Sequence, residues 1–208
     1  ARYQRALFAA DWTYGTLYAI HLTPKGGTYE AKKEEFIFGK PLPLTDVIIG
    51  PHDGAMYFAI GGRRTQSALY RCVYIGSEST EKAPAQPLTP EFVQRRELEA
   101  LHQEGGTSET VAKAIPALSH SDRNIRYAAR IALEHQPLAD WRSQALAQTQ
   151  PDAVIEAAIA LARTALPEDR NDVLRLLGSL VSEKLSVDQS LGAIRALQLV
   201  VIRLGQPD

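Results

Sequence analysis

Several features that would assign a protein to a class are missing from this sequence of 208 residues. Its single cysteine, Cys72, excludes a disulfide within the chain and leaves the redox compartment open. No apolar run approaches the roughly 20 residues that a helix needs to cross a bilayer. A net charge of -1 provides no excess of positive charge for nucleic acid or a membrane surface. Because the sequence starts with neither a methionine nor a signal-peptide pattern, we expect a processed or truncated start.

Motifs that carry chemistry are also missing. The five histidines show neither HExxH nor another metal-ligand spacing. No C-x-x-C-H is present for covalent haem attachment, and "GGRR" (Gly61–Arg64) lacks the frame of a phosphate-binding loop. Cys72 alternates with apolar residues, which is typical of a buried structural thiol. We therefore expect no catalytic residue and no metal site in this chain.

What the sequence does contain, up to about Gly76, is the composition of β-strands. Its runs are rich in β-branched and aromatic residues, which pack well on a pleated surface. "PHDG" supplies a turn, because proline fixes φ and Asp-Gly tolerates a positive φ. These residues predict an antiparallel sheet. The runs are "ALFAADW", "GTLYAIHLT", "YEAKKEEFIF", "TDVIIG", "AMYFAIGG" and "SALYRCVYIG".

A pair of strands recurs within this segment. Ala6–Ala10 resembles Ala55–Ile60, and Thr16–Ile20 resembles Ala68–Val73, at offsets of 49 (7 to 56) and 52 (17 to 69) residues. A β unit that recurs about every 50 residues is typical of the four-stranded blades of a propeller. Two unrelated hairpins of a sandwich are the alternative. "TDVIIG" precedes only the second copy, so the propeller interpretation predicts that the chain begins inside a blade.

An incomplete blade would leave unpaired strand edges with apolar faces beside them. We therefore expect completion by other polypeptide, either the remainder of a parent chain or self-association through β edges. The residues expected to be exposed in this way are Leu7, Phe8, Leu17, Tyr18, Met56 and Phe58.

After a linker rich in Ser, Pro and charge, the pattern becomes helical. Thr89 is a candidate N-cap with Pro90 at the first helical position. The remainder reads as helix pairs, and the second helix of each pair carries A-x-x-A-L at Ala129–Leu133, Ala157–Leu161 and Ala193–Leu197. Small residues at this spacing let helices approach closely, which favours stacked repeats over an irregular helical bundle. "SHSDRNIRYAARIALEH" in particular looks like a HEAT-type repeat, with Asp122 as its cap and Arg126 and Arg130 bracing the stack.

The sequence predicts an α+β chain of two segments. Residues 1–76 would be the C-terminal blades of a propeller, residues 77–90 a linker, and residues 91–208 HEAT-like helical repeats.

Two stretches, "LFAADWTYGTLYAIHL" and "PLPLTDVIIGPHDGAMYFAIGGRRTQSALYRCVYIG", followed by HEAT-like helices, resemble the large membrane-bound dehydrogenases of planctomycete-type bacteria. Those proteins join a propeller like that of glucose/sorbosone dehydrogenases to HEAT repeats. The resemblance implies that the chain is an internal fragment of an exported, periplasmic parent.

A more distant resemblance reaches the soluble quinoprotein glucose dehydrogenases. That family has a Lys in the turn matched by "WTYG" and R-x-R-D at the place matched by "PLTD" (Pro43–Asp46), where the cations pair with carboxylates of the quinone. Only Asp46 of that set is present here. The resemblance implies pyrroloquinoline quinone and calcium for the parent, whereas we expect no cofactor in this chain.

Three functions remain open at this stage. The first is a non-catalytic piece of a larger protein, a propeller end joined to a HEAT-like scaffold that binds protein. The second is part of a quinone-dependent sugar or alcohol dehydrogenase whose active site lies mostly upstream, and the third is a carbohydrate-binding propeller. We favour the first for this chain alone. Residues that would contact a substrate, with a packing role as the alternative for the first two, are Asp11, Trp12, Tyr14, Asp46, Arg63 and Arg64.

Overall fold

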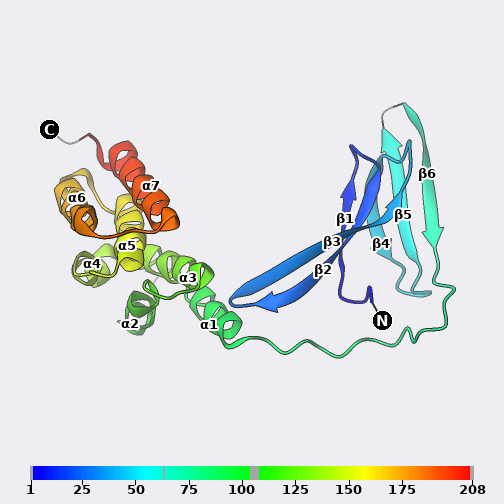
Figure 1. Ribbon diagram of the computed structural model, residues 1–208, viewed down its shortest axis with the longest axis horizontal. Helices are drawn as coiled ribbons and strands as arrows, with labels where there is room; N and C mark the ends of the chain where they lie inside the picture. The colour runs from blue at the N-terminus through cyan, green and yellow to red at the C-terminus, as the bar shows by residue number, and fades with distance from the viewer. Residues whose placement is uncertain (1, 63, 104–107, 207–208) are drawn as a thin grey trace. The chain divides into compact units, whose positions relative to one another are not determined.

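The computed structural model of the protein describes residues 2–62, 64–103 and 108–206. Within these ranges six β-strands are followed by seven α-helices, and no strand follows the first helix (Figure 1). The predicted α+β class is therefore confirmed. The chain divides into two compact units. A β unit comprises Ala1–Lys25 and Tyr29–Pro87, and a helical unit comprises Gly26–Thr28 and Leu88–Asp208.

The β unit holds two three-stranded sheets. β1 (Leu7–Asp11), β2 (Thr16–Lys25) and β3 (Thr28–Phe38) form one sheet in chain order. β1 pairs antiparallel with β2, with Leu7 opposite Ile20.

The second sheet has the same simple order. It consists of β4 (Leu44–Ile49), β5 (Met56–Gly62) and β6 (Thr65–Cys72), with both pairs antiparallel. The turn from β4 to β5 closes with the Gly50 amide 2.8 Å from the Ala55 carbonyl oxygen, and Gly54 adopts φ +64°. The positive φ expected of "PHDG" is therefore present.

The two sheets of the β unit share one apolar core. The alternating residues Met56, Phe58 and Ile60 are buried together with Leu17 and Leu44, and β1 lies against β4. The expectation that Leu17, Met56 and Phe58 are exposed was wrong, because the packed sheets bury them without a further blade.

The other three residues of that expectation differ among themselves. Leu7 is exposed as expected. Phe8 is partly buried against the edge of the Phe36 ring at 5.1 Å, and Tyr18 is partly buried with Lys33 Nζ 4.2 Å from its ring centroid. Of the six residues expected to be exposed, only Leu7 is.

The segment after β6 runs to Thr89 without helix or strand. Residues near the N-terminus hold part of it. The Gln4 side chain donates to the Glu81 carbonyl and accepts from the Ala83 amide, while Arg5 Nη2 donates to the Pro84 carbonyl at 2.5 Å. As far as Pro87, the stretch predicted as a linker thus belongs to the β unit.

Helix α1 (Pro90–Glu99) begins as expected, because Thr89 Oγ1 accepts from the Phe92 amide at 3.1 Å and Pro90 follows it. Three antiparallel pairs then follow the chain. None of the described helices is both long enough and apolar enough to cross a membrane. The remaining helices are α2 (Ser108–Ala117), α3 (Arg123–Glu134), α4 (Leu138–Leu146), α5 (Pro151–Thr164), α6 (Arg170–Gly178) and α7 (Val187–Leu204), with 3-10 turns at Pro167–Asp169 and Ser179–Ser182.

The helix pairs stack in two layers. α2, α4 and α6 contact one another in sequence in one layer, and α1, α3, α5 and α7 do so in the other. The repeated leucine of A-x-x-A-L is 0% exposed in α3 (Leu133) and 1% exposed in α5 (Leu161), but 46% exposed in α7 (Leu197). The same motif is therefore covered at the two inner positions of the stack and half open at the last.

This difference predicts unequal costs for the same substitution. Leu133→Ala should lower the free energy of unfolding of the helical unit by about 2–5 kcal/mol, since it empties a closed site. Leu197→Ala should cost less than about 1 kcal/mol, because that side chain already meets water. Urea titrations followed by far-ultraviolet circular dichroism measure both. Equal losses would mean that the two leucines have equivalent surroundings, contrary to the stacking described here.

Candidate functional site

The turn between β1 and β2 is shaped by Asp11. Its Oδ1 accepts hydrogen bonds from the amides of Thr13 at 2.8 Å and Tyr14 at 2.9 Å, and its carbonyl accepts from Gly15 at 3.0 Å. Gly15 has φ +69°, which closes the turn. Asp11 is thus occupied as a turn residue, while the Tyr14 side chain projects into solvent.

Trp12 links this turn to the hairpin between β5 and β6. Its Nε1 donates to the Gly61 carbonyl at 3.0 Å, and a Cβ at Gly62 would lie only 3.2 Å from the indole. Arg64 follows in the same hairpin with φ +58°, whereas Arg63 lies outside the described residues. Trp12 and the Gly-Arg-Arg turn are therefore neighbours, and the indole N–H is used in packing.

Asp46 is placed differently. It is an exposed residue of β4 opposite Ala59, and its Oδ1 accepts from the adjacent Val47 amide at 2.7 Å. No described contact brings it to Trp12. The substrate-contacting roles of these residues remain a prediction. Among the described residues no group of three or more His, Cys, Asp or Glu side chains is arranged to hold a metal ion.

A polar cluster that sequence patterns did not reveal lies between the β4–β5 turn and β6. Asp53 Oδ2 accepts from the Tyr57 hydroxyl at 2.7 Å and from Arg71 Nη2 at 3.0 Å. These bonds, first that of Tyr57, hold the pKa of Asp53 below its usual range. Tyr57 and Arg71 meet because they are opposite each other in the β5–β6 register. The cluster fixes the turn and leaves its groups satisfied.

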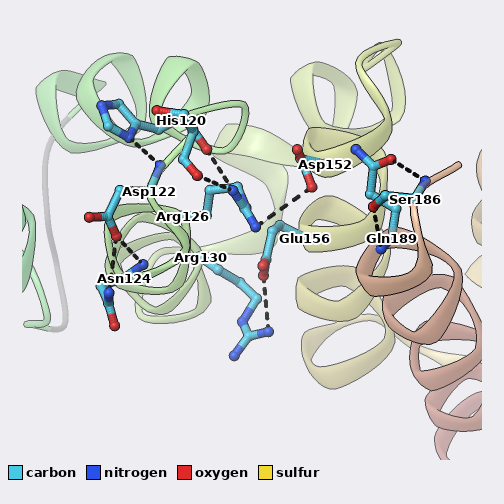
Figure 2. A network of polar contacts seen from close by, with 10 residues as sticks. His120, Asp122, Asn124, Arg126, Arg130, Asp152, Glu156, Ser186 and Gln189 are labelled. Carbon is cyan, nitrogen blue, oxygen red and sulfur yellow. Dashed lines mark hydrogen bonds and ion pairs between the residues drawn. The ribbon is translucent and has the colours of Figure 1, made fainter. Parts of the chain in front are cut away.

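The most extensive polar network lies between α3 and α5, and Figure 2 shows it. Asp122 caps α3 by accepting from the Asn124 amide at 2.7 Å, as predicted. Arg126 Nη1 donates to the carbonyls of His120 at 2.7 Å and Ser121 at 3.0 Å, and its Nη2 lies 3.6 Å from Asp152. One guanidinium thus contacts the connection between α2 and α3 and also reaches α5, which belongs to the following pair.

Arg130 continues the network one turn further along α3. Its Nη1 lies 3.0 Å from Glu156 Oε2 on α5 (Figure 2). Its Nε lies 3.3 Å from Glu134 Oε1. Glu134 in turn accepts from Arg163 Nε at 2.6 Å. The prediction that Arg126 and Arg130 brace the stack is confirmed, because each reaches a carboxylate on the next helix of its layer.

Burial shifts the pKa of Glu156. Removal from water raises the pKa of this carboxyl above its ordinary value, although Arg130 and Arg126 act in the opposite direction. The ion pair therefore compensates only part of the desolvation cost. A corresponding brace ties the other layer, where Arg142 of α4 donates to Asp169 at 2.9 Å and also bonds Asp172. Both layers are thus held together by arginine–carboxylate contacts.

The last helix presents an apolar strip to solvent. We call Val187, Leu191, Ile194 and Ile202 the α7 face, since all four are exposed large hydrophobic residues on one side of α7. Aligned on the repeated motif, Leu191 corresponds to Ile155 of α5, 36 residues earlier (191 to 155). Leu191 is 60% exposed, whereas Ile155, which lies close to Gly192 of α7, is 6% exposed.

The distribution of apolar residues along α7 indicates this strip, whereas the repeated A-x-x-A-L motif does not. α7 is apolar on most of its circumference, whereas a helix with one buried side needs an apolar stripe on that side only. Its first turn is fixed independently by a capping box, in which Ser186 Oγ accepts from the Gln189 amide at 3.2 Å and the Gln189 side chain accepts from the Ser186 amide at 3.0 Å. The α7 face is therefore carried by a helix with a well-formed start.

The α3–α5 network predicts that removing a buried arginine lowers the free energy of unfolding more than removing an exposed one. Arg130→Met should cost about 3 kcal/mol near neutral pH, because it leaves a buried carboxylate without its main partner. The matched change Arg175→Met, at an exposed ion pair, should cost less than about 1 kcal/mol.

The pH dependence gives this prediction a second readout. Because the folded-state pKa of Glu156 is raised, its ionisation opposes folding, and its contribution worsens as pH rises from the unfolded-state pKa through the folded one. Loss of Arg130 should raise the folded-state pKa of Glu156 further. The loss of unfolding free energy in Arg130→Met should therefore shrink as the pH falls. Adding Glu156→Gln should remove this part of the pH dependence. A deficit in Arg130→Met that is independent of pH would contradict the assignment.

Comparisons with known proteins do not assign this chain to a family. No protein-family model, no curated protein and no solved structure matches the chain. The resemblance to the dehydrogenases therefore remains a prediction from the quoted residues, and functional inference starts from the surfaces described above.

Proposed function

We propose that this chain is a non-catalytic protein-interaction scaffold, in which a propeller end precedes HEAT-like repeats whose last helix binds a partner. The observation that carries the proposal is the α7 face. Positions that are closed in α5 are open in α7, although the two helices share the same motif. Exposed large apolar residues gathered on one side of a folded helix, as Val187, Leu191 and Ile194 are, are typical of interaction sites.

The repeat interpretation of both units supports this proposal. In the β unit, two sheets with the same strand order lie face to face, and the recurring hairpin forms β1–β2 in one and β5–β6 in the other. In the helical unit, successive pairs form two parallel layers. Stacked units of this kind present extended surfaces for protein partners.

The chemistry of the α7 face favours an amphipathic helix as the occupant. Val187, Leu191 and Ile194 follow the spacing at which two helices interdigitate. Arg195 is exposed beside them on α7, and Arg203 is exposed in its last turn. A partner helix with apolar residues at the same spacing and acidic residues on its flank would complement both features.

A displayed library of random peptides tests this occupant with the full chain as target. Selection should enrich sequences with apolar residues at i, i+4 and i+7 and with flanking Asp or Glu. Ile194→Glu should weaken the best peptide at least about tenfold, since it places a charge in the apolar contact. The matched variant Leu166→Glu, which also replaces an exposed large apolar residue by glutamate, should bind normally.

Two results would overturn the proposal. Selected peptides whose affinity is the same for Ile194→Glu and for the unmodified chain would place the binding surface elsewhere. Sedimentation equilibrium showing a dimer that Ile194→Glu dissociates would identify a second copy, rather than a heterologous helix, as the occupant.

A further inference from the structure

A cavity of about 390 Å³ lies within the β unit. Three segments line it, namely the residues before β1, the strand β2 and the extended segment after β6, and it is open to solvent on one side. Its volume is in the range of small-molecule sites. The residues that line it are Arg2, Arg5, His21, Leu22, Ala83 and Gln86.

The polar lining is cationic. It contains two guanidinium groups, an imidazole and a carboxamide, and no carboxylate is among the lining residues. The nearest acidic group described is Glu34, which bonds Arg2 and lies 3.4 Å from His21 Nε2. Glu34 thus engages these two residues and leaves Arg5 without an acidic partner among the described contacts.

Among the described contacts, those on the walls of the cavity use one donor of Arg5, whereas Glu34 already engages Arg2 and His21. Arg5 uses Nη2 to bond the Pro84 carbonyl, which is one of the five N–H donors of a guanidinium. Gln4 bonds the backbone on both sides of Lys82, at Glu81 and Ala83. Tyr3 packs edge-on against Phe36 with ring centroids 4.8 Å apart. The segment before β1 is therefore fixed against the segment after β6 by Gln4 and Arg5.

We propose that this cavity binds a small ligand bearing an oxyanion, either a carboxylate or a phosphate group, with Arg5 as the principal donor. The planar fork of a guanidinium matches two oxygens of such a group. His21 and Gln86 add donors from β2 and from the extended segment, while Leu22 and Ala83 offer apolar contact to a short carbon skeleton. The site is separate from the α7 face and does not depend on the scaffold proposal.

Isothermal titration calorimetry of the full chain at constant low ionic strength tests the proposal. Inorganic phosphate and succinate serve as the two probes, with chloride as the ionic control. At least one probe should give saturable heat, and the preferred one reports whether phosphate or carboxylate is the better fit. Arg5→Gln should weaken binding about tenfold or more, because a charge-assisted hydrogen bond is lost. Lys32→Gln, which removes an exposed cation of β3, should bind like the unmodified chain.

A second variant guards against a folding effect, since Arg5 also bonds the Pro84 carbonyl. His21→Gln keeps a neutral polar side chain on β2 and should weaken binding severalfold with an unchanged circular dichroism spectrum. Absence of saturable heat from both probes at millimolar concentration would overturn the proposal. Equal weakening by Lys32→Gln and Arg5→Gln would also overturn it, since that result shows charge screening without a site.

Discussion

The close packing of α5 is the constraint on which the helical unit depends. This helix contacts α3, α4, α6 and α7, and almost every residue from Ala153 to Ala162 is buried. A helix approached from several sides can carry few large side chains, because interior packing leaves no spare volume. Alanine at positions such as Ala157 and Ala160 fits this limited space. On α7 the corresponding small residue is Gly192, where a Cβ would lie 3.0 Å from Ile155.

The placement of charge follows from that apolar interior. Arginine and carboxylate side chains occur where successive helices of a layer meet, as with Arg130 and Glu156 in one layer and Arg142 and Asp169 in the other. Removal of Glu156 from water raises the pKa of its carboxyl, against the effect of the neighbouring arginines. These ion pairs therefore position neighbouring helices relative to each other, while burial of apolar surface supplies the stabilisation.

Local chemistry made much of the fold predictable. Thr89 and Asp122 cap helices because their side chains need only the following few residues, and the three helix pairs follow from periodicity. The burial of Met56 and Phe58 was not predictable in this way, since it depends on which sheet face meets the other. The same holds for the Trp12–Gly61 bond, which joins residues 49 apart (12 to 61), and for the cavity, whose walls Gln4 joins to Ala83. Motif reading located Trp12 and the Gly-Arg-Arg turn but not the contacts that use them.

The two units cover their apolar surfaces in different ways. In the β unit two sheets cover each other, so one apolar face of each is closed by mutual packing. In the helical unit each second helix covers the one before it, so the last helix necessarily lacks a successor within the described stack. An end helix adapted to solvent would replace its outer apolar residues by polar ones, as terminal repeats of soluble stacks do. Leu191 and Ile194 are apolar and exposed nonetheless, which distinguishes the α7 face from the surface between α3 and α5, where arginine and carboxylate side chains pair.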